Sequence, residues 1–146
     1  MSGKLIAIYL KRFRRGPMDS VERANVVAGQ GIEGNTDQGG KRQVTVLSIE
    51  GWRAALAEIE EDVSPQQRRA NLLVEGIELA RSRGRVLRVG STRLRIHGET
   101  RPCERMEEAA EGLEAALDPD WRAGIYGEVL EGGELAVGDS VSFEVT

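Results

Sequence analysis

The side chain with the clearest capacity for covalent chemistry is Cys103, the only cysteine among 146 residues. It lies in residues 100–105 (Thr-Arg-Pro-Cys-Glu-Arg), between two arginines. Nearby cations favour the thiolate, which is the form that acts as a nucleophile and binds metals. A lone cysteine is also a small apolar residue that packs in protein interiors. This segment alone therefore leaves two alternatives open, a reactive thiol and a structural one.

Four other chemistries of a single cysteine fit the sequence poorly. His97 is the only histidine, so a tetrahedral zinc site with Cys103 would need carboxylates as its remaining ligands. A Cys–His hydrolase needs a base within reach of the thiol, and His97 ends a predicted strand that could turn it to either side. Thr100-x-x-Cys103 with Arg101 matches a fragment of the peroxiredoxin motif, but Ile96 stands where that family has proline. A general thiol enzyme also lacks an evident base.

Clusters of arginine are the second feature that could carry chemistry. The chain has a net charge of −4, and a mildly acidic protein with local arginine excess is not a typical nucleic-acid binder. Arg68 and Arg69 with Asn71 could grip an oxyanion through paired donors, or could form a salt-bridged surface turn. A compact anion such as a phosphate suits the clusters best. They lie at residues 11–15, 41–42, 68–69 and 81–105.

Length and composition indicate one globular domain over residues 1–146. Hydrophobic residues make up 40% and charged residues 30%, which is ordinary for a soluble protein. No apolar run approaches the roughly 20 residues that a membrane helix needs, so we expect no membrane partner. The apolar residues 5–10 run into a basic segment without a cleavage site, which argues against a signal peptide. One cysteine and no export signal predict a cytoplasmic protein.

Apolar spacing predicts two helices, each close to one of these chemical features. Ile49 to Ile59 carries a helical stripe with Ser48 placed to cap its start. Met106 to Leu117 carries a second stripe directly after Cys103. Residues 64–67 (Ser-Pro-Gln-Gln) match a capping box and predict a short helical turn that presents Arg68 and Arg69.

Short strands account for most of the remaining chain. The glycines between residues 29 and 40 predict a loop, and Gly132-Gly133 between two strand-like runs predicts a β-hairpin. Many short strands separated by turns, with few helices, indicate a closed or partly closed barrel. We expect strands at residues 4–10, 20–28, 44–47, 86–89, 92–97, 128–131, 134–137 and 140–145.

Seven segments, in order along the chain, resemble the MOSC domain family, which is named for the C-terminal domain of molybdenum-cofactor sulfurases. The resemblance implies a mainly β fold, a MOSC-like barrel with a few short peripheral helices, in line with the strand pattern. The segments are residues 31–34 (GIEG), Arg42 with 44–48, 68–76 (RRANLLVEG), 87–90 (LRVG), Pro102-Cys103, 127–133 (GEVLEGG) and 138–141 (GDSV).

The resemblance also implies a ligand, the molybdenum cofactor or a related anionic pterin, and with it molybdenum ion binding. The cysteine that the family is proposed to use as a sulfur carrier or metal ligand corresponds to Cys103. A soft thiolate suits molybdenum or a persulfide, and arginines with loop amides suit the phosphate of a pterin cofactor. The candidate cofactor-binding residues are Gly34, Asn35, Arg42, Arg68, Arg69, Asn71, Arg101 and Arg105.

Two departures from the family pattern bear on these expectations. Gly34-Asn35 stands where the family commonly has Gly-Asp, which removes a carboxylate that could help to position the cofactor. The chain also lacks the desulfurase domain of full sulfurases, which binds pyridoxal phosphate. We therefore expect pyridoxal phosphate on a separate cysteine desulfurase that supplies the sulfur, and a molybdoenzyme as the acceptor.

Two hypotheses from different classes follow. In the first, the protein is a sulfurtransferase-like carrier in which Cys103 accepts sulfur as a persulfide or ligates the metal of the cofactor. In the second, it is a non-catalytic module that binds the cofactor or docks a partner, and Cys103 is structural.

Overall fold

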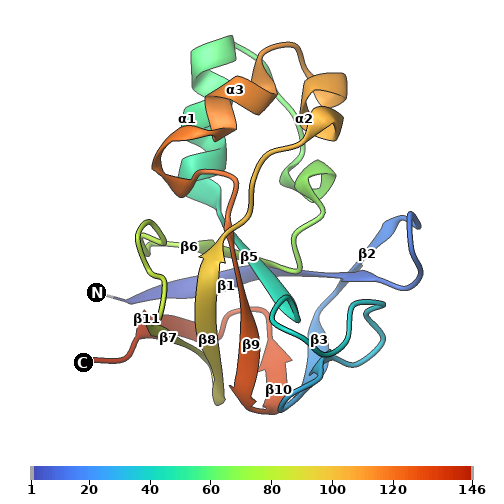
Figure 1. Ribbon diagram of the computed structural model, residues 1–146, viewed down its shortest axis with the longest axis vertical. Coiled ribbons are helices and arrows are strands. Elements are labelled where there is room, and N and C mark those ends of the chain that lie inside the picture. The colour runs from blue at the N-terminus through green and yellow to red at the C-terminus, as the bar shows by residue number, and fades with distance from the viewer. Residues whose placement is uncertain (1, 146) are drawn as a thin grey trace.

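The fold is a closed barrel with a layer of helices at one end, as seen in the computed structural model of residues 2–145 (Figure 1). The strands of the barrel wall are β1 (Ser2–Lys11), β5 (Val44–Ser48), β6 (Leu72–Glu75), β7 (Val86–Val89), β8 (Thr92–Glu99), β9 (Ile125–Glu131) and β11 (Ser140–Phe143). Within the described residues, these seven strands pair in the order β11-β7-β8-β9-β5-β6-β1, and β1 pairs back to β11. The predicted mainly β barrel is thereby confirmed.

Four short strands near the barrel correct one of the sequence predictions. They are β2 (Met18–Val21), β3 (Arg23–Val27), β4 (Gly31–Ile32) and β10 (Gly133–Ala136). The single strand predicted over residues 20–28 is wrong, because the chain breaks at Glu22. β2 extends the barrel sheet beside β1, whereas β3 pairs with β10 and β4 in a second sheet. One apolar run thus serves two sheets.

The β-hairpin predicted around Gly132-Gly133 is also wrong. β9 pairs with β8 along its length and with β5 at residues 125–127, and no ladder joins it to β10 in the described structure. β10 instead pairs with β3, with Leu135 opposite Ala24. Glycine is required at position 132 because a Cβ there would collide with the carbonyl oxygen of Val26. The two glycines therefore allow a close crossing of strands rather than a tight turn.

The helical layer follows the predicted pattern with one break. The helices are α1 (Ile49–Ile59), α2 (Glu104–Ala109), α3 (Leu113–Leu117) and the 3-10 turns η1 (Pro65–Arg68) and η2 (Pro119–Trp121). As predicted, Ser48 caps α1 by accepting from the amide of Gly51, and Ser64 caps η1. The single helix predicted over residues 106–117 is wrong, because Gly112 has a φ of 88° and separates α2 from α3. No helix in residues 2–145 is long and apolar enough to cross a membrane.

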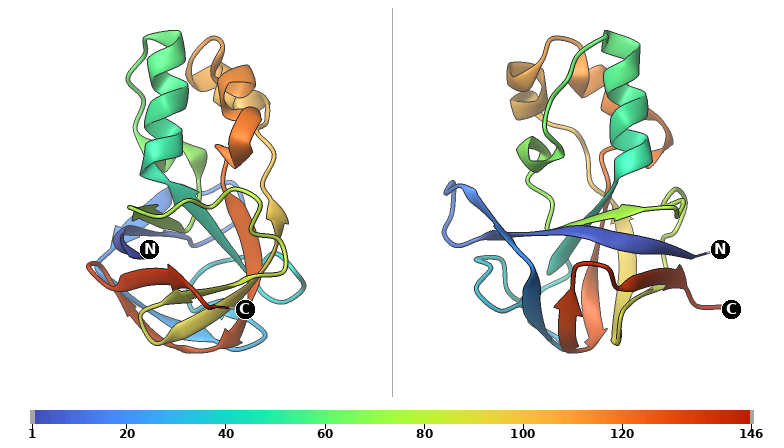
Figure 2. Two further views of the ribbon diagram at one scale, coloured as in Figure 1. Left: turned by 90° about the vertical axis from the view of Figure 1, so that its left-hand side faces the viewer. Right: turned by 180° about the vertical axis from the view of Figure 1, so that it is seen from behind.

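Two apolar cores fix the helical layer to the barrel. One fills the barrel, and the other lies between the helices and the outer face of the barrel wall. Trp52 of α1, Met106 of α2 and Leu113 of α3 are almost fully buried in the second core. Folding α3 back on α2 places both apolar stripes in this core, with α3 against α1. Figure 2 shows that the helical layer lies at one end of the barrel, and that residues 100–105 connect the barrel to this layer.

Candidate functional site

The thiol of Cys103 is exposed and lies at the start of α2. Its backbone is extended, with φ −130° and ψ 175°, and its side chain makes no capping hydrogen bond. The carbonyl oxygen of Cys103 accepts from the amide of Met106, which anchors the first turn of α2 to the second core. An exposed thiol on an anchored backbone does not fit the structural-cysteine alternative, in which burial would account for the residue.

Arg68 holds the segment that precedes Cys103. Its Nε donates to the carbonyl oxygen of Ala123 at 2.9 Å, and its Nη2 donates to Thr100 Oγ1 and to the carbonyl oxygen of Arg101 at 3.1 and 3.2 Å. Thr100 Oγ1 itself donates to the carbonyl oxygen of Ala123. One guanidinium from η1 therefore joins the end of β8, the approach to Cys103 and the start of β9.

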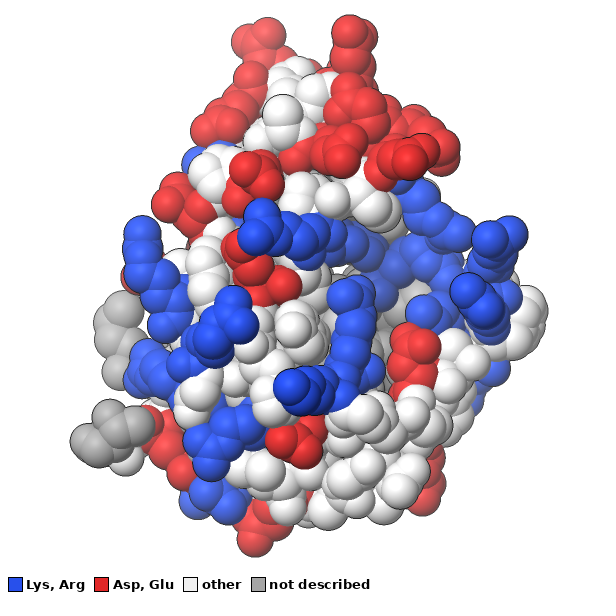
Figure 3. All heavy atoms as spheres, viewed as in Figure 1, with Lys and Arg blue, Asp and Glu red and all other residues white. Residues whose placement is uncertain are grey.

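A cavity of about 290 Å³ adjoins Cys103. In the described structure, seven of its ten lining residues are lysine or arginine and none is acidic. We call it the cationic cavity. In Figure 3, basic side chains gather below the helical layer, while the acidic ones crowd the helices above. Its lining residues are Lys11, Arg14, Arg15, Arg42, Gln67, Arg68, Arg69, Cys103, Arg105 and Met106.

Like charges are held close together in the cationic cavity. Burial lowers the pKa of Arg68, and the positive charge of Arg42 lowers the same pKa further. The charge of Cys103 acts in the opposite direction and raises it. Burial also lowers the pKa of Arg69, and Arg105 lowers it further, against the opposing effect of Asp37. Guanidinium groups remain charged at neutral pH even so. A bound anion would relieve this mutual repulsion.

The charge around Cys103 leads to a prediction about its alkylation. The quantity of interest is the rate of alkylation by iodoacetate, an anion, divided by the rate with neutral iodoacetamide. We expect this ratio to be several-fold higher for Cys103 in the folded protein than in the unfolded chain, because the cavity concentrates anions. The advantage should fall as salt is added, since salt screens charge over roughly 10 Å at 0.1 M. Mass spectrometry measures both alkylation rates from the mass gained at Cys103 over time. Equal rate ratios for the folded and the unfolded chain would contradict it.

The predicted site residues divide into those at the cavity and those beneath it. The structure brings Arg42, Arg68, Arg69 and Arg105 to the cavity with Cys103. Arg101 is on the outside, with a side chain that is 78% exposed and pairs with Glu99 at 3.6 Å. Gly34, Asn35 and Asn71 do not line the cavity.

Asn71 and Asn35 form a buried network beneath the cavity. Asn71 Oδ1 accepts from the amide and the hydroxyl of Thr45, and its Nδ2 donates to the carbonyl oxygen of Tyr9 and to Asn35 Oδ1. Asn35 Oδ1 also accepts from the amide of Lys11. Gly34, at φ 84°, makes the turn that places Asn35 there. The network ties the strands that support Lys11, Arg42 and Arg69.

Sequence reasoning missed three cations of the cavity, Lys11, Arg14 and Arg15. Lys11 is the last residue of β1, and Arg14 and Arg15 follow it. The basic run at residues 11–15 was visible in the sequence, but nothing local showed that it would lie beside Cys103. Lys11 pairs with Asp37 at 2.9 Å. His97 does not line the cavity, because its Nε2 lies 2.9 Å from Glu128 Oε1 on the neighbouring strand. The prediction against a Cys–His dyad agrees with this placement.

The donor set around Cys103 fits an anionic cofactor better than a free metal ion. Among residues 2–145, no group of three or more His, Cys, Asp or Glu side chains could hold a metal. A metal at Cys103 would therefore need to arrive with most of its ligands supplied by a cofactor. The cations of the cavity suit the phosphate of such a cofactor, and the thiolate suits a soft metal.

The structure is thus a small barrel whose exposed thiol opens onto a cationic cavity, an arrangement suited to an anion beside one reactive sulfur. The sequence profile of the MOSC domain matches residues 32–142. The chain therefore belongs to the MOSC domain family, as the sequence resemblance predicted, and this family is associated with the molybdenum cofactor.

Solved structures share the whole fold at low sequence identity. The YuaD protein from Bacillus subtilis is 19% identical, with a TM-score of 0.81 and coverage of 98% of this chain and 96% of that one. YiiM from Escherichia coli is 16% identical, with a TM-score of 0.74 and coverage of 100% and 71%. YiiM from Geobacillus stearothermophilus is 14% identical, with a TM-score of 0.76 and coverage of 98% and 75%. No curated protein matches the sequence significantly.

Proposed function

We propose that this protein binds a molybdenum cofactor or a related anionic pterin in the cationic cavity, and that Cys103 carries sulfur to it or ligates its metal. The observation that carries the proposal is the placement of an exposed thiol among seven cations with no carboxylate in the described lining. Few other ligand classes need both a soft sulfur donor and a surplus of positive charge.

The cations have distinct roles in this proposal. Within residues 2–145, the guanidinium groups of Arg69 and Arg105 make no hydrogen bond to the fold, so they would bind the phosphate directly. Arg42 lies 5.8 Å from the centre of the Tyr126 ring, which holds its guanidinium at the cavity wall. Arg68 uses one edge of its guanidinium to hold the Cys103 segment and adds positive charge beside the thiol.

Sulfur loading at Cys103 needs no oxidant in this scheme. The thiolate of Cys103 attacks the outer sulfur of a cysteine persulfide on a separate desulfurase, and a new S–S bond forms. The S–S bond of the donor breaks, and the donor thiolate leaves with the electron pair. The bound cofactor would supply the metal that takes up the sulfur or the Cys103 thiolate. The neighbouring arginines stabilise the anionic persulfide as it forms.

The partners of the protein follow from this chemistry. A cysteine desulfurase would supply the sulfur, with pyridoxal phosphate bound to that enzyme, and a molybdoenzyme would receive the cofactor. A lone thiol that must stay reduced suits the cytoplasm.

Mass spectrometry tests the proposal. After incubation with a cysteine desulfurase and cysteine, we expect Cys103 to gain the mass of one sulfur atom, and reduction should remove it. Cys103→Ser should lose the gain but still copurify with a pterin after gentle isolation from the native host. Equal behaviour of the wild type and Cys103→Ser in both assays would favour the non-catalytic module instead.

A further inference from the structure

A second and larger cavity, of about 660 Å³, opens between η1 and α2 beside the cationic cavity. We call it the η1–α2 cleft. The two cavities share Gln67, Arg69 and Arg105, so a ligand can extend from one into the other. The remaining lining residues of the cleft are Pro17, Met18, Ser64, Gln66, Glu108 and Ala109.

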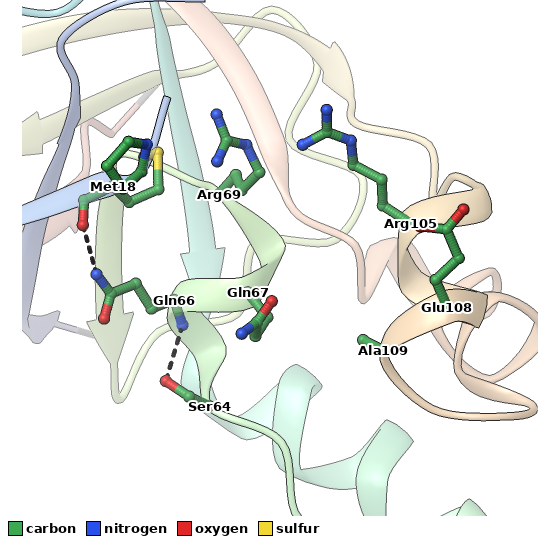
Figure 4. A pocket seen from close by; sticks show the side chains of 9 residues that line it. Met18, Ser64, Gln66, Gln67, Arg69, Arg105, Glu108 and Ala109 are labelled. Carbon is green, nitrogen blue, oxygen red and sulfur yellow. Dashed lines mark hydrogen bonds between the residues drawn. The ribbon is translucent and has the colours of Figure 1, made fainter. Parts of the chain in front are cut away.

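The lining of the η1–α2 cleft differs from that of the cationic cavity beyond the shared arginines. Pro17, Met18 and Ala109 provide apolar surface, and Gln67 provides an amide that projects from η1 toward the cleft (Figure 4). Gln66 Nε2 donates to the carbonyl oxygen of Met18 at 2.6 Å, which fixes this wall before any ligand arrives. The lining therefore combines apolar surface with uncharged hydrogen-bonding groups, which a small organic molecule can use together, and Glu108 adds one carboxylate.

Arg69 and Arg105 stand at the passage between the two cavities. In Figure 4 the side chain of Arg105 extends from α2 toward Arg69, which follows η1 on the other side of the cleft. Burial and Arg105 both lower the pKa of Arg69, and the opposing carboxylate, Asp37, already pairs with Lys11. Two neighbouring cations of this kind suit a phosphoryl or carboxylate group held between them. The passage therefore separates the cationic cavity from a cleft whose own lining is uncharged apart from the carboxylate of Glu108.

We propose that the η1–α2 cleft binds the uncharged heterocyclic ring of a ligand whose anionic group lies between Arg69 and Arg105. This inference rests on the proposed function, which places the anionic part of the ligand in the cationic cavity. The apolar surfaces of Met18 and Ala109 cover the faces of a planar ring. The amide of Gln67 offers both a donor and an acceptor, as the edge of a pyrimidinone ring does.

Filling the η1–α2 cleft without changing charge tests the inference. Ala109 is an exposed residue at the end of α2, so Ala109→Trp would occupy the cleft with little risk to the fold. Ala54→Trp, at an exposed position on α1, is the matched control. The probes are 6-carboxypterin, followed by fluorescence anisotropy, and inorganic phosphate, followed by the protection of Cys103 from iodoacetate.

We expect Ala109→Trp to weaken the binding of 6-carboxypterin by about tenfold or more, and to change phosphate protection by less than about twofold. Gln67→Ala should weaken the binding of 6-carboxypterin several-fold without changing phosphate binding. Arg105→Gln should weaken the binding of both probes, and Ala54→Trp should change the binding of neither. The inference is overturned if wild type does not bind the pterin probe, if Ala109→Trp binds it normally, or if that variant loses both probes equally. Persulfide formation on Cys103, which needs no ring, tests the proposed function separately.

Discussion

Asn71→Ala is expected to lower the free energy of unfolding by about 3 kcal/mol, because the change removes four side-chain hydrogen bonds from a buried position. The amide of Thr45, the carbonyl oxygen of Tyr9 and Asn35 Oδ1 each lose a partner. These groups belong to β5, β1 and the loop after β4, so the loss loosens three segments of the barrel at once. Urea unfolding followed by circular dichroism measures the change.

Two comparisons make this prediction specific. Asn25→Ala is the control, because Asn25 is an exposed asparagine with one long bond of 3.4 Å to Glu33 and should change stability by less than about 0.5 kcal/mol. Thr45→Val removes only the hydroxyl, and with Asn71→Ala it should show a coupling of about 1 kcal/mol. A stable Asn71→Ala protein that fails to bind an anionic pterin would contradict the supporting role and place Asn71 at the ligand.

Arg68→Met is expected to lower the free energy of unfolding by about 2 kcal/mol and to loosen residues 100–106 more than the rest of the chain. Methionine retains much of the apolar stem but none of the three hydrogen bonds to Ala123, Thr100 and Arg101. Hydrogen exchange read by mass spectrometry should rise first in the peptide that contains Cys103. The advantage of iodoacetate over iodoacetamide at Cys103 should fall in the same variant.

Arg68→Lys and Arg101→Gln separate geometry from charge. Lysine keeps the positive charge but not the fork of donors, so Arg68→Lys should retain most of the iodoacetate advantage and still show faster exchange at residues 100–106. Arg101→Gln, at a largely exposed side chain, should leave stability within about 0.5 kcal/mol. If Arg68→Met exchanged uniformly faster across the chain, Arg68 would be a general stabilising residue rather than the anchor of the Cys103 segment.

The elements that sequence reasoning predicted well are those whose signals are local. Ser48 and Ser64 cap α1 and η1 as predicted, because a cap depends only on the next few residues. β8 alternates buried and half-buried residues along its length, so the alternation in its own residues was enough to predict a strand. β6 was missed: Leu72 packs inside the barrel and Leu73 against the helices, so the strand has no alternation to detect.

The two wrong strand predictions share one physical cause, which is pairing with strands that are distant in the sequence. Nothing near Gly132-Gly133 indicates that β10 pairs with β3 rather than folding back on β9. Nothing near Glu22 indicates that the chain leaves one sheet for another. The wrong helix prediction has a different cause. Gly112 was visible as a possible helix break, but α3 folds back because Met106 and Leu113 are then both buried in the second core with α1.

The sequence by itself determined the family, the barrel class and the identity of Cys103 as the one thiol, since these rest on residue types and their order. Only the tertiary structure decided which cations accompany that thiol. Arg14 and Arg105 are 91 positions apart in number, yet line one cavity, whereas Arg101, two residues from Cys103, points away from it. Electrostatic action depends on distance in space, and barrel closure rather than chain order sets that distance.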